Sequence, residues 1–280
     1  METIKTMLDV ARRERYAIGA FNIYNLETVD AVLAAAVELS SPVIIALGER
    51  YLKHFPIQAV AAIAKTMAHY VRVPVALHLD HAQKLESIEL AISAGFTSVM
   101  IDGSKLPLLE NIVFTNRAMA LARPRGVSVE AELGRVVRTG MAEADLFTDP
   151  QEAHQFIEET QVDALAISVG TVHGLYKGEP TLDLVRLAQI AEKVSVPLVL
   201  HGVSGLPDHL IKSAIQLGVA KLNVNTEISI QGVHAVRSFL AEKGNENTRL
   251  EELMIEARTA MVEVVKKYIN FFGSAGKIQR

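Results

Sequence analysis

Short apolar runs alternate with helix-like segments along most of the chain. The eight runs span residues 17–22, 42–48, 74–80, 98–103, 127–134, 163–170, 197–202 and 220–225. Between the runs, apolar residues recur at helical spacing, as in the segment 26–39. Eight strands that alternate with helices predict a (β/α)8 TIM barrel of the α/β class. The runs are apolar throughout rather than at every second position, which is typical of a parallel sheet covered by helices.

A doubly wound open sheet is the alternative arrangement. It usually has fewer strands, and no GxGxxG motif follows the first run. Two further helical stretches, about 227–243 and 248–269, follow the eighth run and exceed what a barrel needs. No Pro/Gly/Ser-rich linker interrupts the chain. We therefore predict one barrel domain over residues 1–280, in which about 227–280 form C-terminal helices for capping or subunit contacts.

Composition excludes several classes of protein. The 280 residues are 50% hydrophobic and carry a net charge of −4, which suits one large domain and argues against a nucleic-acid partner. No apolar run is long enough for a membrane helix, and the N-terminus has no apolar core of a secretory signal. Because there is no cysteine, a metal would need His, Asp or Glu ligands. We expect a cytoplasmic protein that binds neither nucleic acid nor membrane.

Polar side chains stand at or just after the ends of most predicted strands. They are Asn22, Asp80, His81, Asp102, Glu132, His173, His201, Asn223 and Asn225. In a (β/α)8 barrel, the chemistry takes place at the carboxyl ends of the strands. We therefore expect these side chains to form one ring around the mouth of the barrel.

Three histidines of this ring, His81, His173 and His201, are candidate metal ligands. Three protein ligands with an open position are typical of a catalytic zinc site, and imidazole also suits cobalt or iron. The alternative is that each histidine only makes local hydrogen bonds, since there is no HExxH or HxH motif. His78 competes with His81, because the repeated segments 73–78 and 196–201 align His78 with His201. We prefer a structural role for His78, which lies deeper on the same strand face as Asp80.

Segments that lead towards a helix follow the last three strands, and the first two of them contain glycine. They read TVHGLYKG (171–178), HGVSGLP (201–207) and NVNTE (223–227). Backbone N–H groups in such loops bind anions, and loops after strands seven and eight commonly hold phosphate in barrels. Ser204 lacks the GxSxG context of a nucleophile. A metal, phosphate loops and a free carboxylate together indicate carbonyl chemistry on a sugar phosphate.

Several of these motifs resemble one known family. HLDH, GFTSVMIDGS, VSVEAELG, FTDP, SVGTVHGLYKG, VPLVLHGVSG and KLNVNTE are similar to the class II, metal-dependent ketose-bisphosphate aldolases, in the tagatose- and fructose-bisphosphate branch. The resemblance runs from about residue 4 to residue 275. It implies a (β/α)8 barrel that reversibly cleaves a ketose phosphate, such as tagatose or fructose 1,6-bisphosphate, through a metal-stabilised enediolate. The products would be dihydroxyacetone phosphate and an aldehyde, usually glyceraldehyde 3-phosphate.

The resemblance also implies roles for individual residues. His81, His173 and His201 resemble the Zn²⁺ ligands, and Asp80 resembles the acid/base that acts on the C4 hydroxyl. Asp102 and Glu132 resemble the carboxylates around the metal. The dihydroxyacetone phosphate cradle would comprise Gly174, Gly202, Val203, Ser204, Asn223, Val224, Asn225 and Thr226. A monovalent cation such as Na⁺ or K⁺ often lies near that phosphate in the family, and a homodimer or homotetramer is expected.

The sequence departs from the family in the aldehyde half of the site. The family motif GGxED is missing from segment 134–150, where Glu143 or Asp145 would have to supply the carboxylate that works on C3. Arg50 and Arg138 are expected at the distal end of the substrate, and Glu49 stands where relatives usually carry a small residue. We therefore hypothesise a ketose phosphate other than fructose 1,6-bisphosphate, either acidic or otherwise substituted.

Two other functions remain open from the sequence. A metal-free Schiff-base aldolase needs a lysine inside the barrel, and Lys221 is the only candidate because it shares a strand face with Asn223 and Asn225. A non-catalytic barrel subunit that stabilises a partner aldolase would explain the altered 134–150 loop, but it would have no need for Asp80 and all three histidines.

Overall fold

The computed structural model describes residues 1–280 except 137–145, 175, 177, 245–246 and 279–280. Eight parallel strands close into a barrel in chain order, with β8 pairing to β1. The strands are β1 (Ile18–Asn22), β2 (Val43–Gly48), β3 (Val75–Ala82), β4 (Ser98–Ile101), β5 (Ser128–Leu133), β6 (Ala164–Ile167), β7 (Leu198–Leu200) and β8 (Val219–Val224). The predicted (β/α)8 TIM barrel is confirmed.

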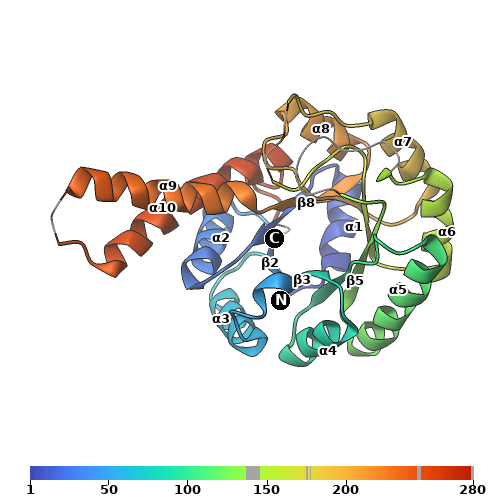
Figure 1. The fold of residues 1–280 in the computed structure, drawn as a ribbon, viewed down its shortest axis with the longest axis horizontal. Coiled ribbons are helices and arrows are strands. Elements are labelled where there is room, and N and C mark those ends of the chain that lie inside the picture. Colours follow the sequence, from blue (N-terminus) through green and yellow to red (C-terminus); the bar gives the residue numbers. More distant parts are fainter. Residues whose placement is uncertain (137–145, 175, 177, 245–246, 279–280) are drawn as a thin grey trace.

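Helices surround the barrel on its outer side (Figure 1). They are α2 (Leu26–Glu38), α3 (Ile57–His69), α4 (Leu85–Ala94), α5 (Leu108–Ala122), α6 (Pro150–Thr160), α7 (Leu184–Lys193) and α8 (Asp208–Gln216), with short 3-10 turns η1 (Glu49–Tyr51) and η2 (Arg123–Arg125). Local sequence sets where they begin. For example, α6 starts because the Asp149 carboxylate accepts from the backbone N–H groups of Gln151 and Glu152, while Pro150 takes the first helical position.

Two apolar layers hold the barrel together. The outward-facing side chains of the strands pack against the ring of helices. The inward-facing layer is built largely from small residues, including Ala20, Ala46, Ala76 and Ala166. Helix α1 (Ile4–Glu14) packs against this inner layer through Ile4, Met7 and Leu8, among others. Above this layer, the carboxyl ends of the strands form the mouth of the barrel, where the chemistry of such barrels takes place.

The two extra C-terminal helices form a hairpin that projects from the barrel (Figure 1). Helix α9 (Thr226–Lys243) packs along α10 (Leu250–Phe272), and α10 also contacts α2. These bounds agree closely with the stretches predicted at about 227–243 and 248–269. None of the described helices combines the length and apolarity that a membrane span requires.

Candidate active site

The polar residues at the strand ends line one cavity of about 960 Å³ at the mouth of the barrel. The predicted residues among its lining are Asn22, Arg50, Asp80, His81, Asp102, Glu132, His173, Gly174, His201, Gly202, Ser204, Asn223, Asn225 and Thr226. The structure thus brings together residues from the ends of β1, β3, β4, β5 and β8 and from the loops after β2, β6 and β7. Glu143 and Arg138 lie outside the described residues.

Asp80 and His81 are neighbours in β3, yet both face the cavity. Regular alternation would direct them to opposite faces of the sheet. The pairing of β3 with β4 shifts register between Leu79 and Ala82, and His81 adopts a left-handed backbone with φ of 51°. This irregularity at the strand end turns the His81 imidazole inward, beside the carboxylate of Asp80.

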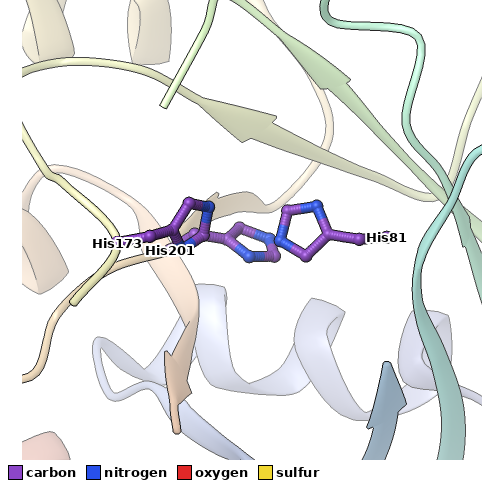
Figure 2. Close-up of side chains that lie close together, drawn as sticks. All are labelled: His81, His173 and His201. Carbon is purple, nitrogen blue, oxygen red and sulfur yellow. The ribbon is translucent and has the colours of Figure 1, made fainter. Parts of the chain in front are cut away.

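Three imidazoles converge in the cavity: His81 from β3, His173 from the loop after β6 and His201 from the end of β7 (Figure 2). Their ring centroids lie 5.1 Å apart for His81–His173, 4.5 Å for His81–His201 and 6.0 Å for His173–His201. One nitrogen from each lies within 4.8 Å of the others. Such a cluster can bind one divalent cation, and neutral imidazoles suit zinc.

Hydrogen bonds fix how two of these rings are turned. Nδ1 of His81 lies 3.0 Å from Oδ2 of Asp102, whereas its Nε2 is buried and meets no hydrogen-bond partner in the part of the chain that the structure describes. Nε2 of His201 lies 3.1 Å from Oε1 of Glu130. A ring nitrogen bonded to a carboxylate carries its proton, which leaves the other nitrogen as the candidate metal ligand.

Burial and neighbouring charges shift the titration of the site. Burial, aided by His81 and His201, lowers the pKa of His173 to about 3. Burial alone would lower the pKa of His81, but Asp80 and Asp102 raise it to about 9. Burial and the nearby Asp102 raise the pKa of Glu132 to about 8. Within the described residues, Oε2 of Glu132 is buried without a hydrogen-bond partner, and His81, Asp102 and Glu132 form a second group that could share a cation.

The Asp80 carboxylate is held by two side-chain amides. Nδ2 of Asn22 donates to Oδ2 and Nδ2 of Asn223 donates to Oδ1, each at 3.0 Å. Burial alone would raise the pKa of Asp80, but His81, His201 and Lys221 together lower it well below its usual range. Asp80 is therefore an ionised carboxylate in a fixed orientation at the edge of the cavity, and it can accept a proton.

A layer of buried polar residues lies beneath the cavity. His78 is fully buried, and its Nδ1 lies 2.7 Å from the Ser98 hydroxyl. It does not belong to the cluster formed by His81, His173 and His201. Lys221 and Glu130 are also fully buried, with Nζ 2.9 Å from Oε2. Glu130 was missed in the sequence analysis. The available signal was its position two residues before Glu132, which places both carboxylates on the inner face of β5.

The loops after β6 and β7 approach each other at Gly202. Gly174 and Gly202 have φ of 98° and 68°, and a Cβ at Gly202 would lie 2.3 Å from the carbonyl oxygen of Val172. The Tyr176 hydroxyl joins the same loops, donating to the Gly202 carbonyl oxygen at 2.7 Å. These glycines, Ser204 and the first residue of α9, Thr226, border the cavity.

Two predicted cradle residues lie elsewhere. Val203 and Val224 are fully buried in the apolar layer between barrel and helices, and neither lines the cavity. Their side chains face away from the cavity because their neighbours in the chain face it: Gly202 and Ser204 flank Val203, and Asn223 and Asn225 flank Val224. Only their backbone groups can contribute to ligand binding.

Basic side chains line the cavity along the loops after β2 to β5. They are Arg50, Lys53, Lys84, Lys105 and Arg135. The Arg50 guanidinium stacks 4.6 Å above the Tyr51 ring centroid. Glu49 is the acidic neighbour: its Oε2 accepts from the backbone N–H of Gln83 at 3.1 Å, while Oε1 is buried without a partner. Glycine-containing loops follow β6 and β7, and Asn225 and Thr226 follow β8, so the cavity has two chemically different sides.

Known proteins share this whole architecture. The profile of the family described as "Fructose-bisphosphate aldolase class-II" matches residues 2–277. The YdjI aldolase from Escherichia coli K12 is 36% identical, with a TM-score of 0.90 and 99% of each chain covered. A putative fructose-1,6-biphosphate aldolase from Coccidioides immitis is 32% identical, with a TM-score of 0.88 and coverage of 97% of this chain and 96% of that chain. The fructose-bisphosphate aldolase of Campylobacter jejuni shares the fold at 24% identity, with a TM-score of 0.85 and coverage of 98% and 95%.

Proposed function

Since the chain belongs to the class II fructose-bisphosphate aldolase family, a family of carbon–carbon lyases, we propose that it is a zinc-dependent aldolase acting on a ketose phosphate. It would cleave the C3–C4 bond reversibly, releasing dihydroxyacetone phosphate and an aldehyde. The observation that carries the proposal is the convergence of His81, His173 and His201, in which the buried Nε2 of His81 has no hydrogen-bond partner among the described residues.

The donor set fits a divalent cation held by three imidazoles. His81 and His201 each have one nitrogen bonded to a carboxylate, which is the usual way in which metal-binding histidines are oriented. Asp102 would neutralise part of the positive charge around His81, and Oε2 of Glu132 lies 3.5 Å from the same ring nitrogen. When bound, the cation supplies a Lewis acid that draws electron density from the ketone oxygen and stabilises the charge left by cleavage.

Asp80 is proposed as the group that moves the hydroxyl proton. In the cleavage direction its carboxylate takes the proton from the C4 hydroxyl, the C3–C4 bond breaks, and the C4 fragment leaves as the aldehyde. The fixed carboxylate can perform this step because Asn22 and Asn223 leave it little freedom to turn away. The acid that then protonates C3 would come from segment 134–150, where Glu143 is the candidate.

The side of the cavity after β6 to β8 is proposed to hold the phosphate of the dihydroxyacetone half. Gly174, Gly202 and Ser204 border it, together with Asn223, Asn225 and Thr226 at the start of α9. Backbone N–H groups in glycine loops and at a helix N-terminus favour an anion. A monovalent cation, Na⁺ or K⁺, is expected near this phosphate.

The basic side is proposed to hold an anionic distal end of the substrate. Arg50 and Lys84 lie in the loops after β2 and β3, across the barrel from the loops after β6 and β7, and Arg135 lies in the loop after β5. Tagatose and fructose 1,6-bisphosphate both carry a second phosphate at that end. A ketose phosphate with another acidic group there is the alternative. In either case the Glu49 carboxylate could accept from a substrate hydroxyl.

The rival functions receive less support. Lys221 is fully buried, is paired with Glu130 and is not among the residues that line the cavity, so it is poorly placed to attack a substrate carbonyl. A non-catalytic subunit would have no need for the oriented histidines and Asp80.

We also expect cytoplasmic location, no nucleic-acid or membrane partner, and a homodimer or homotetramer. The subunit contact would use the C-terminal hairpin, whose Val233 and Ile255 are exposed.

Release of dihydroxyacetone phosphate tests the proposal. Purified protein is incubated with fructose and tagatose 1,6-bisphosphates and with ketose phosphates whose distal group is neutral or carboxylated, with added zinc or with chelator. Zinc-dependent release is expected, with preference for an anionic distal end. Chelator-resistant release, together with borohydride trapping on Lys221, would establish the Schiff-base alternative. No release from a zinc-loaded protein with any of these substrates would favour the non-catalytic subunit.

A further inference from the structure

Buried hydrogen bonds connect the proposed metal ligand His201 with the proposed proton acceptor Asp80. The connection passes through Glu130 and Lys221, which lie below the cavity on β5 and β8, and through Asn223 of β8, which lines the cavity. Glu130 and Lys221 are fully buried and Asn223 is 6% exposed. The inference drawn from this connection rests on the proposed function, because it concerns how the same site is oriented.

Lys221 stands at the centre of the connection. Its Nζ donates to Oδ1 of Asn223 at 2.6 Å and to Oε1 of Glu130 at 3.1 Å, and it forms an ion pair with Oε2 of Glu130 at 2.9 Å. An ammonium group has donors only, so the atom of Asn223 that faces it must be the carbonyl oxygen. The amide nitrogen of Asn223 is then directed to Asp80, to which it donates at 3.0 Å.

Glu130 transmits the same constraint to the histidine. An ionised carboxylate has acceptors only, so the nitrogen of His201 that lies 3.1 Å from Oε1 must carry the proton. Nδ1 of His201 then keeps its free lone pair, which is what binding a metal requires. Lys221 stabilises the ionised form of Glu130 in a position where a lone carboxylate would be costly to bury.

We propose that Lys221 is a positioning residue that sets both the orientation of the Asp80 carboxylate and the tautomer of His201. It acts through Asn223 on one side and Glu130 on the other, and it touches neither substrate nor metal. This role explains why a lysine is buried inside the barrel of an enzyme whose chemistry does not need a covalent lysine adduct.

The rival explanation is that Lys221 and Glu130 only stabilise the barrel. The two explanations separate in the double variant Glu130→Leu/Lys221→Met, which replaces the pair with apolar side chains of similar length. Removing one partner leaves an unpaired buried charge and should lower stability, whereas removing both should largely restore it. A positioning role predicts that metal binding and turnover do not recover with stability.

The experiment compares the parent, Lys221→Met, the double variant and Ser128→Ala. Ser128 is a buried polar residue on the same strand as Glu130. Among the bonds described, its hydroxyl accepts only from the backbone N–H of Lys5. Its replacement therefore controls for the loss of a buried polar side chain from β5. Four quantities are measured: the urea midpoint of the metal-free protein, the zinc affinity by chelator competition, the visible spectrum of the Co²⁺ form, and kcat at saturating zinc.

In the double variant, we expect a urea midpoint close to that of the parent, zinc affinity reduced by about 10- to 100-fold and an altered Co²⁺ spectrum. We also expect kcat to fall by about 100-fold at saturating zinc, because Asp80 loses its fixed orientation. Ser128→Ala should resemble the parent in zinc affinity, spectrum and kcat.

Parent-like zinc affinity, Co²⁺ spectrum and kcat in the double variant would overturn the inference. If the double variant does not fold, Glu130→Gln serves instead: an amide cannot accept at both oxygen positions, so zinc affinity should fall about tenfold, and a parent-like affinity would again overturn it. Failure of the proposed function is seen separately, as a parent protein that binds zinc but releases no dihydroxyacetone phosphate.

Discussion

Gly202 occupies the point where the two later histidine loops touch, and a side chain there should damage the site. It directly follows His201, and its nearest neighbour, Val172, directly precedes His173. A Cβ at residue 202 would lie 2.3 Å from the Val172 carbonyl oxygen, whereas real Cβ contacts essentially never fall below 3.0 Å. The Gly202→Ala substitution must therefore push the backbones of these loops apart, since no flexible side chain can yield.

We predict that Gly202→Ala lowers kcat/KM for the ketose phosphate by about 100-fold, because a misplacement of about 1 Å in a catalytic constellation can have an effect of that size. Zinc affinity should also fall, since His173 and His201 move relative to each other. The measurements are steady-state release of dihydroxyacetone phosphate and chelator competition for zinc.

Gly126→Ala is the matched control. Gly126 has φ of 66°, against 68° for Gly202, but a Cβ there would meet no heavy atom within 4 Å. Both substitutions therefore force alanine into the left-handed region, at a cost of about 1–2 kcal/mol in the free energy of unfolding. Only Gly202→Ala should lose activity. Equal kcat/KM in the two folded variants would refute the steric argument.

Three further predictions concern the proposed chemistry. Asp80→Asn should lower kcat by about 10²- to 10⁴-fold while bound zinc, measured by metal analysis, is retained; turnover near that of the parent would exclude Asp80 as the proton acceptor. Arg50→Met should raise KM about tenfold for a bisphosphate but leave KM unchanged for a ketose monophosphate with a neutral distal end, and an equal change for both would place Arg50 outside that subsite. His81 has a raised pKa of about 9 in the metal-free protein, so it is protonated at pH 7 and must lose that proton to bind zinc. Calorimetry should therefore show that zinc affinity rises about tenfold per pH unit from about pH 7 to 9. A zinc affinity that does not change with pH over this range would contradict the prediction.

Most of the barrel could be predicted from the sequence because strand signals are local. All eight apolar runs correspond to strands, with ends that coincide or differ by at most three residues. β3 continues to Ala82, beyond the predicted end at residue 80, because the irregularity at His81 extends its pairing to β4. Helix α1 was not predicted, since its role in packing against the inner layer depends on closure of the barrel and not on its neighbours in sequence.

The sequence predicts which strand-end residues line the candidate site, but not the contacts of the residues that lie beneath it. The last residues of the strands meet because parallel strands share a carboxyl edge. Glu130 was missed because it stands one inward position deeper than Glu132, and only the packed barrel shows that it reaches His201 and Lys221. Lys221 was interpreted as a Schiff-base candidate because its strand face was visible in the sequence, whereas its ion pair with β5 was not.

The central claim is that His81, His173 and His201 together hold the catalytic metal, and zinc-edge anomalous diffraction from zinc-loaded crystals tests it most directly. We predict one strong peak in contact with Nε2 of His81 and Nδ1 of His201, with His173 as the third ligand. A peak held instead by His81, Asp102 and Glu132 alone, or no peak at the three histidines, would contradict the account.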